Sequence, residues 1–162
     1  MIRWTERLNL RPVSAEDIEP LRTIHADPRT NQFRPGGTPS LASCDRMIAQ
    51  FITDWQEDRI GYWTVRWGCR VIGCAGVRGI HFSGRPSWNL YYRFDPSTWG
   101  RGLATEAATA AVRYAAGELP PRPVVARTRP ANAGGIAVAE RAGLVRRPDL
   151  DTDGFAVLAL GW

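Results

Sequence analysis

The spacing of apolar residues changes near residue 60, and this change limits the folds open to the chain. From about Ser40 to Asp58, apolar side chains recur every three or four positions, which is the spacing of an amphipathic helix. Their stripe consists of Cys44, Met47, Ile48, Phe51, Ile52 and Trp55. Beyond it, segments rich in aromatic and β-branched residues predict three strands, at 62–67, 70–77 and 87–94. Gly68 and Ser83–Pro86 punctuate them, so we expect an antiparallel meander.

Further elements are predicted on both sides of this meander. Ser14–Asp17 has the pattern of a capping box that starts a helix, and Asp27-Pro28 ends that helix. The remaining segments are a strand at 8–11, a loop at 29–39, a helix at about 101–116 closed by Gly117, a strand at 124–129, a short helix at 135–142 followed by Gly143, and a strand at 155–160. The order β-α-α-β-β-β-α-β-α-β predicts an α/β fold, with a mixed, mostly antiparallel sheet flanked by helices. We expect a single domain over residues 1–162.

Composition supports a globular enzyme-sized domain. The 162 residues are 44% hydrophobic and 23% charged, which excludes a disordered tail, a collagen-like repeat and a coiled coil. The longest uncharged apolar runs, such as Ala107–Val112, are too short to cross a membrane. The first residues do not form a basic-then-apolar signal peptide, so we expect a cytoplasmic protein.

The arginines, cysteines and histidines argue against two other classes of function, nucleic-acid binding and metal binding. The net charge is +5, but every basic residue is arginine and the arginines are scattered along the chain, which indicates coding bias more than a nucleic-acid footprint. A nucleic-acid-binding domain is kept only as a third hypothesis. The three cysteines have no CxxC spacing, and the two histidines, His25 and His81, lie far from them, so we expect no metal site.

Residues 95–107 carry the pattern most typical of a ligand-binding site. The chain leaves an aromatic strand and enters a helix through Gly100 and Gly102, whose lack of Cβ atoms lets a ligand approach the backbone. Unpaired N–H groups at a helix N-terminus suit a phosphate or pyrophosphate, Ala104 is small, and Thr105 adds a hydroxyl. The spacing is neither GxGxxG nor GxxxxGK[ST]. Taken alone, the segment could equally be a tight turn into a helix.

The segment Trp99-Gly100-x-Gly102-x-Ala104-Thr105-Glu106-Ala107 resembles the acyl-CoA pyrophosphate loop of the GNAT N-acetyltransferase superfamily, in particular its RimJ/RimL-like branch of ribosomal-protein N-terminal acetyltransferases. Three other segments resemble that branch in order and spacing, so the resemblance covers about residues 5–162. They are Thr5-Glu6-Arg7-Leu8 with Leu10-Arg11-Pro12, Val71-Ile72-Gly73, and Asn132-x-x-Gly135 followed by Glu140-Arg141-Ala142-Gly143-Leu144. The resemblance implies the GNAT fold and acetyl-CoA as co-substrate.

The resemblance also implies which residues contact the cofactor. The strand before the loop would pair its backbone with the pantetheine arm around Phe94, and Asn132 would contact the cofactor near its sulfur or pantetheine arm. The loop that would hold the pyrophosphate comprises Trp99, Gly100, Arg101, Gly102, Leu103, Ala104 and Thr105. Asn132 could instead cap the short helix that follows it, and Trp99 could simply pack at the edge of the loop.

The catalytic and acceptor residues are less clearly marked, because the sequence departs from the family pattern. Asn89 stands where many members of the branch have Glu, Ala139 stands where many superfamily enzymes have a Tyr general acid, and Gly135 replaces the usual Ser or Ala. We expect Asn89 to hold a water and Tyr92 to bring its hydroxyl to the attack site, with ordinary sheet packing as the alternative for each. The acceptor-binding candidates are Phe33, Arg34 and Trp88.

These residues predict an N-acetyltransferase that transfers the acetyl group of acetyl-CoA to a primary amine by direct attack in a ternary complex. The acceptor could be a protein N-terminus or a small-molecule amine. The alternative is a catalytically inactive CoA-binding protein that serves as a sensor or partner, which the missing Glu and Tyr motivate. The apolar segment Phe155–Leu160 with Trp162 could form a homodimer interface or a buried strand.

Overall fold

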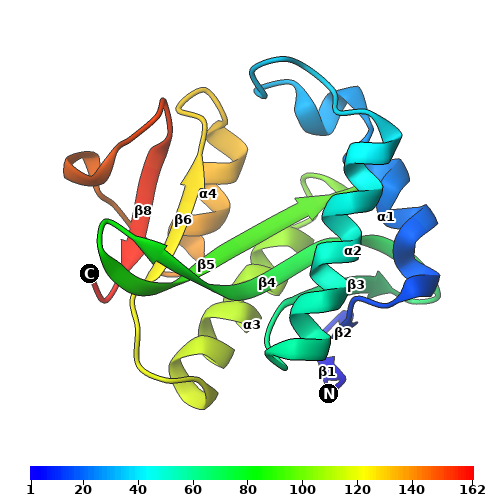
Figure 1. Cartoon of the computed structure of the whole chain (residues 1–162), viewed down its shortest axis with the longest axis horizontal. Coiled ribbons are helices and arrows are strands. Elements are labelled where there is room, and N and C mark those ends of the chain that lie inside the picture. Colours follow the sequence, from blue (N-terminus) through cyan, green and yellow to red (C-terminus); the bar gives the residue numbers. More distant parts are fainter.

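A computed structural model describes residues 1–162 and shows one eight-stranded sheet with the order β1-β2-β3-β4-β5-β6-β8-β7, flanked by four α-helices (Figure 1). The strands are β1 (Arg3–Trp4), β2 (Leu8–Pro12), β3 (Tyr62–Trp67), β4 (Arg70–Phe82), β5 (Arg85–Phe94), β6 (Val124–Thr128), β7 (Val145–Arg146) and β8 (Ala156–Leu160). The helices are α1 (Ile18–His25), α2 (Leu41–Glu57), α3 (Leu103–Glu118) and α4 (Ala133–Arg141), with short 3-10 turns η1 (Ala15–Asp17), η2 (Pro28–Asn31), η3 (Pro96–Thr98) and η4 (Pro148–Leu150).

The predicted fold class and the order of the longer elements are confirmed, and the differences have local causes. The two-residue strands β1 and β7 are too short to show a period, so the sequence did not reveal them. Strand β4 extends five residues past the expected end, to Phe82, because it pairs with β5 over its full length. Gly117 does not end the third α-helix: it lies in the last turn of α3, and the chain leaves the helix at Leu119.

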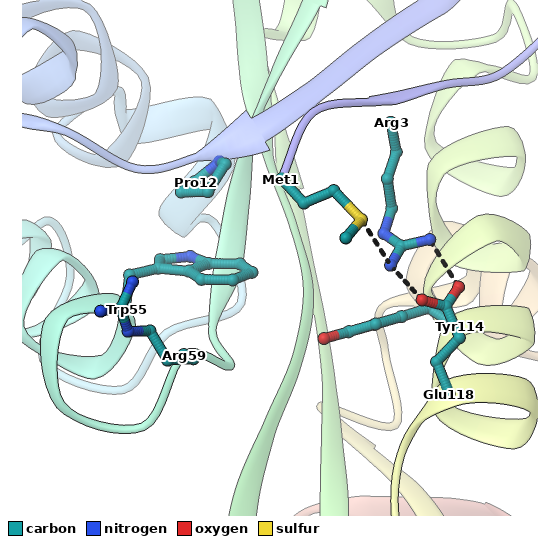
Figure 2. Close-up of a pocket in the computed structure, with 7 residues that line it drawn as sticks. All are labelled: Met1, Arg3, Pro12, Trp55, Arg59, Tyr114 and Glu118. Atoms are coloured by element: carbon teal, nitrogen blue, oxygen red, sulfur yellow. Dashed lines mark hydrogen bonds and ion pairs between the residues drawn. The ribbon is translucent and has the colours of Figure 1, made fainter.

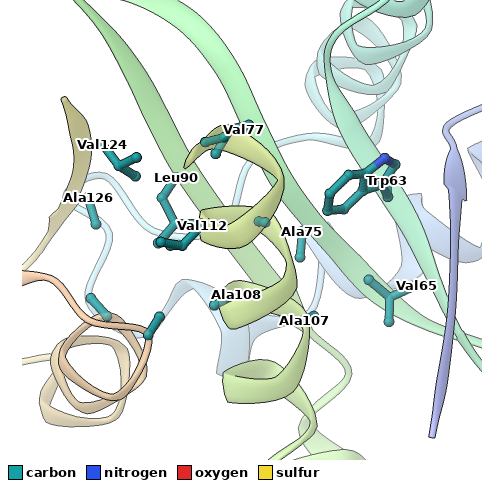
Figure 3. Packing of buried hydrophobic residues seen from close by; sticks show 14 of the residues in the cluster. Trp63, Val65, Ala75, Val77, Leu90, Ala107, Ala108, Val112, Val124 and Ala126 are labelled. Atoms are coloured by element: carbon teal, nitrogen blue, oxygen red, sulfur yellow. The ribbon is translucent and has the colours of Figure 1, made fainter. Parts of the chain in front are cut away.

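Helix α3 packs closely on one face of the sheet because its buried side chains are small. Ala107, Ala108 and Ala111 are each fully buried against the sheet. Figure 3 shows this helix lying across residues such as Val65 and Leu90 of the central strands. Four of the six buried residues of α3 are alanines, and these small side chains let the helix axis approach the sheet. The first turn of α3 is thereby held next to the end of β5.

Helices α1 and α2 cover the opposite face of the same central strands. Leu21 of α1 and Ile48 and Phe51 of α2 form a second core cluster with Val13, with Tyr62 of β3 and with Cys74 of β4. Side chains alternate along β5, because successive residues of a strand point to opposite faces. Leu90 and Phe94 belong to the core on the α3 face, whereas Tyr91 packs against the cluster beneath α1 and α2.

His25 joins α1 to the sheet inside this second cluster. Its Nδ1 lies 2.8 Å from the Leu21 carbonyl oxygen and its Nε2 lies 3.0 Å from the Tyr91 hydroxyl. The carbonyl can only accept, so Nδ1 carries the proton, and the Tyr91 hydroxyl donates to Nε2. Burial and the positive charge of Arg93 lower the pKa of His25 from 6.5 to about 4.

This buried neutral histidine predicts a specific loss of stability in mild acid. The unfolded chain protonates His25 near pH 6.5 and the folded chain near pH 4, so the unfolded state binds more protons between these values. We expect the wild type to lose about 3 kcal/mol more than His25→Gln as the pH falls from 7 to 4, with no further contribution below that. Urea unfolding of both proteins at a series of pH values measures this difference, and parallel stability curves would contradict it.

Candidate functional site

The sheet opens between β5 and β6. These strands are parallel and pair only at Trp88 with Val124 and Asn89 with Val125, after which they diverge (Figure 1). The Trp88 N–H donates across to the Pro123 carbonyl at 2.8 Å, whereas the Asp95 N–H donates to Ile72 on the β4 side at 2.8 Å. Alternate residues of a strand direct their backbone groups to alternate edges.

By this alternation, the backbone N–H and C=O groups of Tyr92 and Phe94 face the opening, like those of Trp88, but they have no strand to pair with. The Phe94 carbonyl accepts a bond from the Trp99 indole nitrogen at 3.1 Å. The other groups form an unpaired strand edge, which can hydrogen-bond an extended ligand that carries amides of its own.

A cavity of about 570 Å³ occupies this opening. The 3-10 turn η2 and Phe33 form one wall, the end of β5 forms the floor, and the first turns of α3 and α4 form the other wall. The charged residues among its lining are Arg29, Arg93 and Arg141, and no Asp, Glu or His lines it. The cavity therefore favours an anionic ligand and contains no carboxylate or imidazole base.

The N-terminus of α3 forms an anion-binding corner of this cavity. Gly100 and Gly102 both have φ of +74°, a left-handed conformation that favours glycine. Gly102 is the N-cap residue, and Leu103, Ala104 and Thr105 form the first turn, whose N–H groups have no partner within the helix. Backbone donors and the positive end of the helix dipole together suit a pyrophosphate.

A hydrogen-bond cluster of Thr5, Arg7 and Glu106 fixes this corner from behind. The Glu106 carboxylate accepts from the Thr5 hydroxyl at 2.5 Å, from the Arg7 backbone N–H at 2.8 Å and from Arg7 Nε at 2.6 Å. Arg7 also donates to the Arg101 carbonyl at 2.9 Å, which ties the glycine loop to the N-terminal segment. Burial favours the neutral acid, but the bonds from Thr5 and Arg7 outweigh it and lower the pKa of Glu106.

Glu106 would repel a pyrophosphate if its charge were free, since it lies in the first turn of α3. The ion pair with Arg7 balances that charge. Sequence reasoning noted Thr5, Arg7 and Glu106 only as parts of separate motifs. Nothing in the sequence showed that residues about one hundred positions apart would meet.

Ten of the residues predicted to form the site line this one cavity. They are Phe33, Tyr92, Phe94, Trp99, Gly100, Gly102, Leu103, Ala104, Thr105 and Asn132. Arg101 belongs to the same loop, but its guanidinium lies 5.6 Å from the ring of Trp67 and does not line the cavity. Arg34 donates to the Gly37 carbonyl and is also absent from the lining.

The expectation that Trp88 binds the acceptor is wrong. Its side chain is 3% exposed, belongs to the core on the α3 face and donates from the indole nitrogen to the Pro120 carbonyl at 3.1 Å. Asn89 does not line the cavity either, because its Nδ2 donates to the Tyr62 hydroxyl at 2.7 Å. Both residues lie where β5 and β6 are still paired, below the opening.

Tyr92 and Asn132 meet at the first turn of α4. The Tyr92 hydroxyl donates to the Gly135 carbonyl at 2.6 Å, and burial raises the pKa of Tyr92. Asn132 Oδ1 accepts from the Gly135 N–H at 3.0 Å, and its Nδ2 donates to Thr128 Oγ1 at 3.0 Å. Asn132 therefore caps α4, as the alternative interpretation held, while its side chain also lies on the cavity wall.

The same contacts explain Gly135. A Cβ atom there would lie 2.5 Å from Asn132 Nδ2 and 3.0 Å from Thr128 Oγ1, so a larger residue would displace the cap. The local packing of α4 thus explains why Gly135 stands where the family usually has Ser or Ala.

A second cavity, of about 430 Å³, lies elsewhere on the molecule (Figure 2). It is lined by Met1, Arg3, Pro12, Trp55, Arg59, Tyr114 and Glu118. Arg3 pairs with Glu118 at 2.6 Å across it. It has no glycine loop and no helix N-terminus in its lining, so it offers none of the backbone donors found next to β5.

The structure has neither a cluster of metal ligands nor a membrane-spanning helix. No cluster of three or more His, Cys, Asp or Glu residues is arranged to hold a metal ion. None of the helices combines the length and the apolar character that crossing a bilayer requires.

A sheet that opens beside a glycine-rich helix N-terminus, with unpaired strand edges in the opening, agrees with the resemblance to acyl-CoA-dependent acetyltransferases. The sequence profile of the acetyltransferase (GNAT) domain matches residues 7–145. The chain belongs to this family and is an acetyl-CoA-dependent acyltransferase.

Solved structures agree with this assignment. An acetyltransferase from Agrobacterium tumefaciens C58 superposes with a TM-score of 0.85 at 28% identity, covering 100% of this chain and 95% of that chain. A GNAT-family acetyltransferase from Bacillus anthracis gives a TM-score of 0.81 at 18% identity over 99% and 98% of the two chains. RimL, a ribosomal L7/L12 alpha-N-protein acetyltransferase solved with coenzyme A, gives 0.77 at 16% identity over 99% and 97%. The last two similarities concern the fold.

The glycine loop yields a matched pair of variants. Gly102 (φ +74°) and Gly84 (φ +75°) have the same conformation, but Gly84 lies in the β4–β5 turn, outside the cavity lining. We expect Gly102→Ala and Gly84→Ala each to lower the free energy of unfolding by about 1 kcal/mol, the cost of a left-handed alanine.

Only Gly102→Ala should also weaken acetyl-CoA binding, by about tenfold, because a Cβ there would lie 3.5 Å from Arg7 Nη2 and disturb the contacts that hold the loop donors in place. Isothermal titration calorimetry checks the affinity and thermal unfolding checks the stability. Equal acetyl-CoA affinity in the two variants would show that the loop does not contact the cofactor.

Proposed function

We propose that the protein is an N-acetyltransferase that transfers the acetyl group of acetyl-CoA to a primary amine by direct attack in a ternary complex. The observation that carries the proposal is the position of the cavity between β5 and β6. Its lining comes from α3 and α4 on one face of the sheet and from the turn η2 beside α1 and α2 on the other. A cofactor and an acceptor can therefore meet in the opening from opposite faces.

The cofactor would bind on the α3 side. The N–H groups from Gly100 to Thr105 would hold the pyrophosphate, and the free edge at Tyr92 and Phe94 would pair with the amides of the pantetheine arm. Asn132, at the start of α4, would contact the cofactor near its sulfur or pantetheine arm. RimL, a protein with the same fold, was solved in complex with coenzyme A, which supports coenzyme A as the kind of ligand.

The chain would act mainly by placing the two reactants, since no acidic or imidazole side chain lines the cavity. Holding a neutral amine in line with the thioester carbonyl supplies much of the rate enhancement, and a backbone N–H of the free β5 edge can polarise that carbonyl. The Tyr92 hydroxyl lines the cavity and, because burial raises its pKa, stays protonated at neutral pH. We assign Tyr92 as the hydroxyl nearest to the departing sulfur, to which it would donate by giving up its bond to the Gly135 carbonyl.

Asn89 is assigned a lesser part. Its Nδ2 is held by the Tyr62 hydroxyl, while its Oδ1 has no partner within the chain and can accept from a water at the base of the opening. Such a water could carry the proton released by the amine away from the cavity. In this proposal, catalysis requires neither the Glu that Asn89 replaces nor the Tyr that Ala139 replaces.

A thiol-release assay tests the function. The purified chain, acetyl-CoA and a panel of primary amines, including short peptides with free N-termini and small-molecule amines, are expected to release free CoA only when a suitable amine is present. Binding of acetyl-CoA is measured separately, and ATP takes the place of acetyl-CoA as the control in that measurement. Acetyl-CoA binding without amine-dependent release across the panel would favour the alternative, an inactive CoA-binding sensor or partner protein.

The absence of a titrating base in the cavity predicts the pH dependence. We expect kcat/KM to rise about tenfold per pH unit until it levels off at the pKa of the amine itself, because only the neutral amine attacks. An acceptor amine with a lower pKa should reach its plateau at a lower pH, and the shift in pH should equal the difference between the two amine pKa values. An inflection between pH 5 and 8 that stays fixed when the amine changes would reveal a base on the protein and contradict this mechanism.

A further inference from the structure

Arg93 lies on the floor of the cavity as a half-buried cation without a carboxylate partner. It is the penultimate residue of β5, between Tyr92 and Phe94, whose backbone groups face the opening. No Asp or Glu approaches its guanidinium within salt-bridge distance, whereas Arg29 of the same cavity is paired with Asp27 at 2.7 Å. Removing an arginine from water without a counter-charge costs free energy, so a structure that keeps one beside a cavity suits an anionic ligand.

The surroundings hold Arg93 in place while leaving most of its donors free. Its Nη1 donates to Asn31 Oδ1 at 3.0 Å. Asn31 is 3% exposed, and its Nδ2 donates to the carbonyls of His25 and Asp27, which fixes its oxygen toward the guanidinium. A guanidinium has five N–H donors, and this arrangement occupies one of them.

The direction of Arg93 assigns it to the acceptor and not to the cofactor. Tyr92 and Phe94 point to the face covered by α3, where the glycine-rich start of α3 lies, and residue 93 points to the opposite face. It contacts Asn31, next to the wall formed by residues 29–33. The cofactor's phosphates and the Arg93 side chain therefore lie on opposite sides of the sheet.

From these observations we infer that Arg93 binds a carboxylate of the acceptor, and that the preferred acceptors are amines with a carboxylate near the amino group. The planar fork of arginine matches a carboxylate with two parallel hydrogen bonds. This inference rests on the proposed function and narrows its substrate class. The carboxylate can belong to a free amino acid or to an acidic side chain near a peptide N-terminus. In both cases Arg93 would bind a carboxylate close to the amine that is acetylated.

Matched pairs of amines distinguish these sources. One pair is L-alanine and L-alaninamide, and the other is the peptide amides Ser-Asp-Ala and Ser-Asn-Ala. For each pair, the ratio of kcat/KM for the acid to kcat/KM for the amide is measured in the wild type and in Arg93→Gln, Arg93→Lys and Arg113→Gln. Comparing ratios between proteins cancels the different pKa values of the amines. Arg113 is exposed on α3 outside the cavity lining, so its variant controls for the loss of one positive charge.

We expect Arg93→Gln to lower the ratio at least tenfold for one pair, through KM more than kcat, as for the loss of a charge-assisted bond. Arg93→Lys should keep part of the preference, and Arg113→Gln all of it. Unchanged acetyl-CoA affinity and melting temperature in Arg93→Gln would exclude misfolding. The pair that responds identifies the source of the carboxylate.

An unchanged ratio in Arg93→Gln for both pairs, with amines still acetylated, would overturn this inference and leave the proposed function intact. Absence of acetylation for all four amines and for the wider amine panel would overturn the proposed function, and the inference with it.

Discussion

The pairing between β5 and β6 stops after two residue pairs, and the active-site architecture depends on this interruption. A central strand whose backbone groups lose their partner must find another, since unpaired buried N–H and C=O groups are costly. Here the structure bridges the opening with side chains: the Tyr92 hydroxyl reaches Gly135 of α4, and the Trp99 indole reaches the Phe94 carbonyl. The remaining groups give an extended, amide-bearing cofactor arm a strand edge to pair with.

The small residues of α3 place the second half of the site next to this opening. Its alanine face lets the helix approach the sheet, which brings the left-handed glycines at its start to the end of β5. The cluster of Thr5, Arg7 and Glu106 then holds the loop and balances the acidic charge in the first turn. The glycine loop, the N-terminus of α3 and the strand edge of β5 thus border one cavity, although each arises from a different part of the chain.

Local patterns in the sequence predicted most of the fold, and the family resemblance pointed to a glycine loop that lines the cavity in the structure. The helical stripe of 40–58, the aromatic strands and the glycine loop are local signals, and they were recovered within a few residues. Long-range contacts were not predicted. Trp88 was expected at the acceptor site because the hairpin beyond Ile80 is rich in aromatic residues and arginine, but Trp88 pairs with Val124 of β6 and its side chain lies in the core. Arg93 was missed because nothing local distinguishes an unpaired arginine from the many others of this chain.

Backbone amide chemical shifts during titration with acetyl-CoA test the central claim most directly, because they show which residues contact the cofactor. The account predicts the largest changes at Tyr92, at Phe94 and from Gly100 to Thr105. The residues around the second cavity, such as Arg59 and Tyr114, should change little. Changes centred on that second cavity, or no changes at millimolar acetyl-CoA, would contradict the assignment of the opening between β5 and β6 as the cofactor site.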